Sequence, residues 1–116
     1  MLTKIFHSFT FALRGLRTVW AEELNFRIEL LVSVLVIVVA LYNQFSFFEL
    51  AICITAITIL LAAEIINTVI EDICNKVEPE HDSVIGKIKD TSAAFVLVSG
   101  LGSFALVLIT FYSHFM

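Results

Sequence analysis

The chain has 116 residues, which suits a single domain; 59% of them are hydrophobic and only 16% are charged. A soluble fold of this size needs more polar surface than this composition supplies, so lipid is the natural solvent for the apolar excess. The mild net charge of −4 gives no support for nucleic-acid binding.

Residues 2–20 are predicted to form an amphipathic helix. Their large apolar side chains recur at helical spacing and form one stripe: Phe6, Phe9, Leu13, Leu16 and Trp20. Two interpretations are open, a helix lying in the membrane interface and an ordinary core-facing helix. The interfacial placement is favoured because basic residues share the segment and a membrane span follows directly.

Three apolar stretches after this helix are each long enough to cross a bilayer. Spans are expected at about 27–43, 47–74 and 90–114, with a polar loop at 75–89. About 20 apolar residues cross a hydrocarbon core of ~30 Å. The predicted fold class is therefore an all-α membrane protein with three transmembrane helices and an N-terminal interfacial helix.

The distribution of Lys and Arg predicts the orientation. All seven lie in the N-terminal region or in residues 76–89, whereas the 42–49 turn and the C-terminal residues hold none. By the positive-inside rule both basic segments are cytoplasmic, and three spans then place the C-terminus outside.

Glu64, Asn67 and Glu71 are the leading functional candidates. They share one helix face, and Glu64 directly follows an uncharged run. A carboxylate at the edge of a membrane is costly and is a functional candidate by default. The alternative, that these residues only end a helix near water, is less favoured because apolar residues separate them.

Two further polar segments are expected at the same membrane surface. Glu23 and Arg27 lie four residues apart, so they either form a simple ion pair or belong to the acidic site. Lys87 and Lys89 either anchor the third span or bind phosphate. Carboxylates that hold Mg²⁺ against phosphates, with lysines nearby, suit phosphoryl transfer. The chain has no P-loop, no kinase Gly-rich loop and no Cys/His cluster for zinc.

These motifs resemble the prokaryotic diacylglycerol kinase family, which includes undecaprenol kinases. The resemblance lies in the E-x-x-N-x-x-x-E run at 64–71 and the K-D pair at 89–90, with further matches at 14–17 and 20–29. It implies a homotrimer in the bacterial inner membrane. It also implies ATP- and Mg²⁺-dependent phosphorylation of a lipid hydroxyl at the cytoplasmic face.

The resemblance also implies roles for individual residues. Glu64 is the expected general base, with Asn67 orienting groups around it, and Glu23 and Glu71 are the expected metal ligands. The nucleotide is expected to contact Lys4, Phe11, Glu23, Glu71, Glu80, His81, Asp82, Lys89 and Asp90. The lipid is expected near Asn25, Phe26, Arg27, Ile28, Glu29, Glu64 and Ala93.

The substrate and two other function classes stay open at this point. Asn25, Phe26 and Arg27 resemble the undecaprenol kinases, whereas Glu29 resembles the diacylglycerol kinases, which are slightly favoured. A small transporter with Glu64 as a proton or cation site gives no role to Glu71, Lys89 and Asp90. A non-catalytic membrane adaptor leaves the acidic segments without a purpose.

Overall fold

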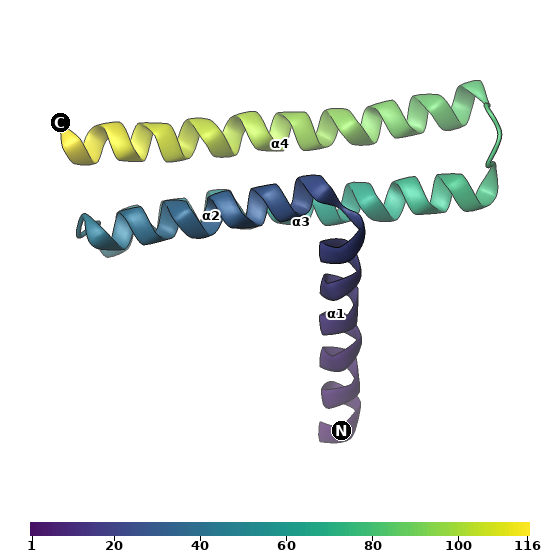
Figure 1. Ribbon diagram of the computed structural model, residues 1–116, viewed down its shortest axis with the longest axis horizontal. Coiled ribbons are helices and arrows are strands. Elements are labelled where there is room, and N and C mark those ends of the chain that lie inside the picture. Colours follow the sequence, from purple (N-terminus) through teal and green to yellow (C-terminus); the bar gives the residue numbers. More distant parts are fainter.

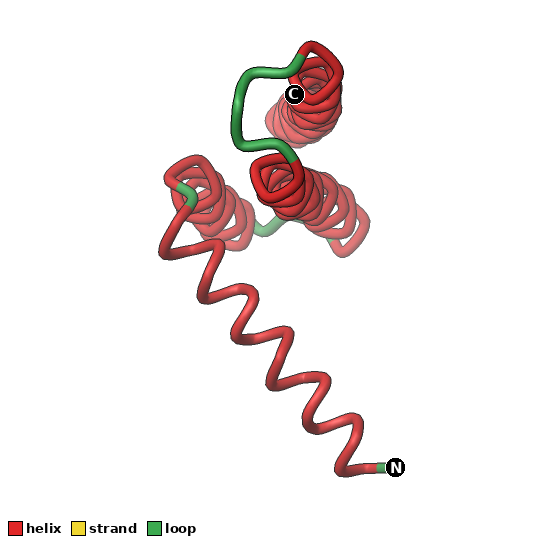
Figure 2. Tube along the Cα trace, turned by 90° about the vertical axis from the view of Figure 1, so that its right-hand side faces the viewer, coloured by secondary structure: helices red, strands yellow, loops and turns green.

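The chain is entirely α-helical in a computed structural model that describes all of residues 1–116. Its four helices are α1 (Leu2–Glu22), α2 (Leu24–Tyr42), α3 (Phe47–Val77) and α4 (Ser83–Phe115). Helices α2, α3 and α4 run alongside one another, and α1 projects away from them (Figures 1 and 2). The last three are long and apolar enough to cross a membrane, which confirms the predicted all-α class with three candidate spans.

The side chains of this bundle face outward to an unusual degree for a folded domain. Only 15 of the 116 residues are buried, and seven of those are polar or charged. Large apolar side chains such as Leu35, Phe104 and Ile109 are more than half exposed. This inside-out distribution suits lipid, because helices in a bilayer pack through small and polar residues while their apolar side chains meet the acyl chains. Between α3 and α4, for example, the Ser103 hydroxyl donates to the Ala56 carbonyl oxygen at 2.8 Å.

Helices α3 and α4 continue past the apolar spans at the end where they are joined. With 31 and 33 residues they are about 46 and 50 Å long, more than the ~30 Å of hydrocarbon. The irregular connection covers only residues 78–82, so it is shorter than the expected loop at 75–89. The reason is a cap: Asp82 Oδ1 accepts from the Val84 and Ile85 amides at 2.9 and 3.0 Å and starts α4 early.

The turn between α2 and α3 is tight and well bonded. The Gln44 amide donates to the Leu41 carbonyl at 3.1 Å, and the Phe45 amide donates to the Ala40 carbonyl at 3.0 Å. This pair of bonds is a Schellman motif, and it places Gln44 in the left-handed region with φ of 60°. The Phe45 ring then packs with Ala40 and Cys53 in the buried cluster at this end of the bundle.

The left-handed residue generates a prediction. Gln44→Gly should raise the free energy of unfolding by about 1 kcal/mol, because glycine adopts this conformation without the clash of a Cβ atom. Gln44→Val should lower it, since a β-branched side chain tolerates positive φ least. Unfolding by SDS in mild-detergent micelles measures both. A loss of stability in Gln44→Gly, as expected for glycine inside a helix, would contradict this account of the turn.

Candidate active site

The boundary between α1 and α2 leaves one carboxylate free at the bundle edge. Glu23 is the single residue between the two helices, with extended backbone angles of −111° and 106°. Its amide donates to the Val19 carbonyl and ends α1, and its own carbonyl accepts from the Arg27 amide as α2 begins. The Glu23 side chain caps neither helix, so its carboxylate is available for another partner.

The predicted polar face of α3 is held in place by a relay of hydrogen bonds. The Ser92 hydroxyl of α4 donates to Asn67 Oδ1 at 2.7 Å, and Asn67 Nδ2 donates to Glu71 Oε1 at 3.1 Å. Glu64 lies on the same face with only 3% of its surface exposed. Asn67 therefore positions Glu71 in this arrangement, and its expected role of orienting groups around Glu64 stays a prediction.

Two residues that the sequence interpretation did not assign to the site take part in it. One is Ser92, the donor in the relay, and the other is Asn75, whose Oδ1 accepts from Lys89 Nζ. Both carry a signal in the sequence. Asn75 follows Glu71 by four residues and so continues the same face of α3, and Ser92 follows Lys89 by three on α4.

Negative charge in this cluster has no positive partner within the chain. The pKa of Glu23 is raised above its ordinary value, first by burial and then by the nearby charges of Glu71, Asp72 and Glu22. Glu64 in turn lies within electrostatic range of both Glu23 and Glu71. A simple ion pair of Glu23 with Arg27, one of the two alternatives raised by the sequence, is absent, and the only ion pair in the chain joins His114 to Glu49.

These carboxylates fit a divalent cation that is shared with another ligand. No group of three or more His, Cys, Asp or Glu side chains is close enough to hold a metal ion alone. Magnesium, however, is commonly bound by one or two carboxylates together with substrate phosphates and water. Glu23 and Glu71 supply that number of carboxylates, and a cation beside them would offset the charge repulsion that, after burial, contributes to the raised pKa of Glu23.

A narrow groove of about 120 Å³ opens between α2, α3 and α4 next to this cluster. Glu29, Ser33 and Ser103 supply its polar lining, and the remaining lining includes Val36, Ile57, Leu60 and Phe104. The Glu29 Oε2 atom is buried and has no hydrogen-bond partner, and the same is true of Arg27 Nε. A molecule with a polar head and an apolar tail matches such a groove.

The remaining residues that are expected to contact the lipid or the nucleotide differ in their solvent exposure. Phe26 is buried at the start of α2, and Lys89 is half-buried. The others are exposed, namely Asn25, Ile28, Glu80, His81, Asp82, Asp90 and Ala93. One carboxylate oxygen of Asp82 is already engaged in the cap of α4.

Lys4 and Phe11 of α1, which are expected to contact the nucleotide, do not reach the acidic cluster of their own chain. Lys4 lies in the first turn of α1, at the end that projects away from the bundle (Figure 2). Phe11 is 60% exposed, and the Arg14 guanidinium lies 5.4 Å from the centre of its ring. That cation–π contact occupies one face of the ring.

Comparison with known proteins identifies the family of this chain. The family described as prokaryotic diacylglycerol kinase matches residues 10–111. The diacylglycerol kinase of Escherichia coli strain K12 is 26% identical over 97% of this chain and 93% of its own length. That of Haemophilus influenzae is 24% identical over 84% of this chain and 83% of its own. The family match covers most of the chain, including every element of the acidic cluster, and the chain therefore belongs to the prokaryotic diacylglycerol kinase family.

Proposed function

We propose that this protein is an ATP-dependent kinase that phosphorylates the hydroxyl of a membrane lipid, converting diacylglycerol to phosphatidic acid at the cytoplasmic face. The observation that carries the proposal is the buried Glu64 on one face with the Ser92–Asn67–Glu71 relay, beside a groove with a polar end and an apolar body. Membership of the family supports the same reaction class.

In this proposal Glu64 is the general base. It takes the proton of the lipid hydroxyl as the lipid oxygen forms a bond to the γ-phosphorus of ATP, and the bond from that phosphorus to the bridging oxygen of ADP breaks. Burial beside the acyl region suits this role, because the lipid hydroxyl reaches only the edge of the hydrocarbon. Glu29 Oε2, buried and unpartnered, is available to accept a hydrogen bond from the polar end of the lipid.

The nucleotide side of the site uses the other carboxylates and the lysine. Glu23 and Glu71 would hold Mg²⁺, which would supply positive charge beside the phosphates of the nucleotide. Lys89 contacts phosphate, and Asn75 holds its ammonium group at the same edge until the nucleotide binds. Asp90 and the exposed loop residues Glu80 and His81 lie on segments adjoining this edge.

Orientation and assembly complete the proposal. The segregation of Lys and Arg supports a cytoplasmic location for the N-terminal region and for the connection between α3 and α4, on the side where ATP is found. A homotrimer in the bacterial inner membrane is proposed because one chain leaves Lys4 and Phe11 of α1 away from its own acidic cluster. A neighbouring subunit can supply such residues.

Undecaprenol is the alternative substrate, because Asn25, Phe26 and Arg27 at the start of α2 resemble that branch of the family. A transporter that uses Glu64 as an ion site is the alternative from another class. A transport function would not explain why the relay positions Glu71 or why Asn75 contacts Lys89.

Transfer of ³²P from γ-labelled ATP to a panel of lipid alcohols in vesicles tests the reaction and the substrate. We expect labelled phosphatidic acid when diacylglycerol is supplied, at a rate above that of labelled undecaprenyl phosphate. The reverse preference would establish the undecaprenol alternative. An absence of label in every lipid, for protein shown to be folded, would reject the kinase.

Glu64→Gln is expected to reduce kcat by roughly 10²–10⁴-fold, the usual contribution of a general base, because the amide cannot accept the proton. ATP affinity should change little, since the proposed phosphate and metal contacts lie on other residues. Glu49→Gln, at the far end of the same helix, is the matched control and should keep its rate. If Glu64→Gln lost ATP binding while staying folded, Glu64 would belong to the metal site instead.

Glu71→Gln and Glu23→Gln should each raise the Mg²⁺ concentration for half-maximal activity by roughly tenfold or more, because each removes an anionic oxygen from a hard-cation site. Asp72→Asn is the control, since it removes a neighbouring exposed charge without removing a proposed ligand. A Mg²⁺ titration of initial rate measures all three variants. An equal shift in the control would mean that general electrostatics, and not ligation, explains the effect.

A further inference from the structure

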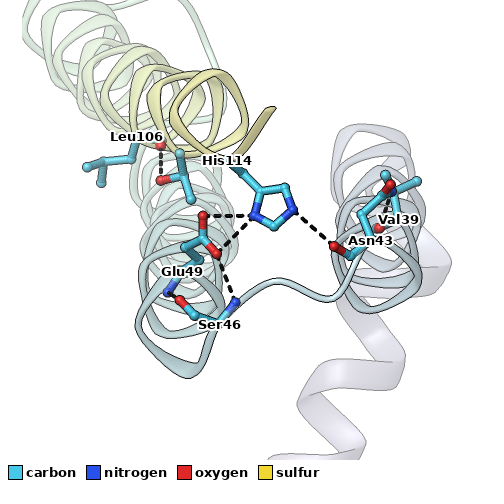
Figure 3. A network of polar contacts seen from close by, with 7 residues as sticks. Val39, Asn43, Ser46, Glu49, Leu106 and His114 are labelled. Atoms are coloured by element: carbon cyan, nitrogen blue, oxygen red, sulfur yellow. Dashed lines mark hydrogen bonds and ion pairs between the residues drawn. The ribbon is translucent and has the colours of Figure 1, made fainter. Parts of the chain in front are cut away.

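A second polar network lies at the opposite end of the bundle, away from the acidic cluster. His114 in the last turn of α4 contacts the Glu49 carboxylate in the first turn of α3 and the backbone oxygen of Asn43, which ends α2 (Figure 3). The imidazole also stacks on Phe45, with 4.1 Å between ring centres. We call Asn43, Phe45, Glu49 and His114 the clasp.

The geometry of the clasp decides the charge of the histidine. Nε2 of His114 lies 3.0 Å from the Asn43 carbonyl oxygen, and a carbonyl oxygen only accepts, so Nε2 must carry a hydrogen. Nδ1 lies 3.1 Å from both oxygens of Glu49. An ionised carboxylate also only accepts, so Nδ1 must carry a hydrogen as well. Both ring nitrogens donate only in the imidazolium form.

Glu49 has its own reasons to be the ionised partner. It is the third residue of α3, where the helix dipole favours negative charge. Its Oε1 accepts from the Ser46 amide at 2.8 Å, while the Ser46 hydroxyl accepts from the Glu49 amide at 3.1 Å. This reciprocal capping box uses the carboxylate as an acceptor. In the neutral alternative, a protonated Glu49 donates to a neutral imidazole, and the favourable interaction of its negative charge with the helix dipole is lost.

The clasp also has a distinct place in the packing. The other polar side-chain contacts between helices join α3 to α4, through Ser92, Ser103 and Lys89. The bond from His114 Nε2 to Asn43 is the one side-chain hydrogen bond that connects α4 to the end of α2. The aromatic rings of Phe45 and Phe111, 4.7 Å apart, lie beside it. The clasp therefore closes the three-helix bundle at this end.

We propose that the clasp is a pH-sensitive fastening, complete only while His114 carries two ring hydrogens, that holds the C-terminal ends of α2 and α4 together. Loss of one proton leaves either Nδ1 facing a carboxylate or Nε2 facing a carbonyl as two acceptors in contact. On the orientation proposed above, this end faces the outside, so the fastening responds to external pH. The inference does not depend on the lipid-kinase activity.

The direction of the pH dependence follows from the groups around the imidazole. Glu49 from α3 is its charged neighbour, and the turn from α2 contributes only the neutral Asn43 oxygen and Phe45. The other titratable side chains at this end are Cys53 on α3, Tyr42 on α2 and Tyr112 on α4. Because only the doubly protonated imidazole makes both contacts, the contribution of the clasp to stability is present at the lower pH and is lost when the ring gives up a proton.

The experiment compares SDS-induced unfolding at pH 6.0 and 8.5 for the full chain in mild-detergent micelles, followed by near-ultraviolet circular dichroism. The wild type should lose stability on going to pH 8.5, by roughly threefold to tenfold in the folding equilibrium constant. His114→Gln and Glu49→Gln should lose most of this pH dependence. His7→Gln is the matched control, because His7 on α1 makes no polar contact through its side chain, and it should keep the wild-type dependence.

A second measurement on the unaltered chain covers the case in which a variant does not fold. Ring ¹⁵N chemical shifts of selectively labelled histidines should show both nitrogens of His114 protonated at pH 6.0 and one of them free at pH 8.5. A neutral tautomer at pH 6.0 would overturn the proposal. So would a pH dependence of unfolding that is the same in folded His114→Gln as in the wild type.

Discussion

Hydrocarbon cannot solvate charges or unpaired backbone groups, and the rest of this structure depends on that constraint. Each span is a helix because a helix satisfies its own amides and carbonyls. Residues 30–48, 50–63 and 91–113 carry no Asp, Glu, Lys or Arg, and the charged residues gather outside these stretches. The polar groups that do lie between helices, such as the Ser103 hydroxyl, are paired with a partner inside the protein.

The two ends of the bundle meet this constraint in opposite ways. Where α1 meets the bundle, partway along α3 (Figure 1), Glu23, Glu64 and Glu71 lie near one another with no positive partner. At the other end, Glu49 and His114 satisfy each other. A cluster whose repulsion is left unrelieved is costly unless something binds there, whereas a satisfied pair mainly fixes the fold. This contrast is the physical reason for assigning chemistry to the first end and fastening to the second.

The proposed base, Glu64, and the proposed metal ligand, Glu71, lie at different positions along α3. Glu64 and Glu71 are seven residues apart, which is about 10 Å of helix, so they lie at different heights relative to the membrane. The shallower Glu71 is fixed through Asn67 and Ser92. The deeper Glu64 is buried in line with the adjacent apolar run. A reaction between a water-soluble nucleotide and a lipid needs this offset, because neither reactant has to leave its own solvent.

The sequence by itself determined the helices and the faces they carry. Hydropathy and helical periodicity predicted the all-α class, three apolar spans and the shared face of Glu64 and Glu71, because one helix has a fixed geometry. Pairings between helices were decided only by the tertiary structure, including Ser92 with Asn67 and His114 with Glu49. A periodic pattern describes each helix about its own axis, whereas the rotation and register of two helices depend on how their side chains pack. The same limit explains the short connection at 78–82, since the cap that extends α4 depends on the backbone geometry at Asp82.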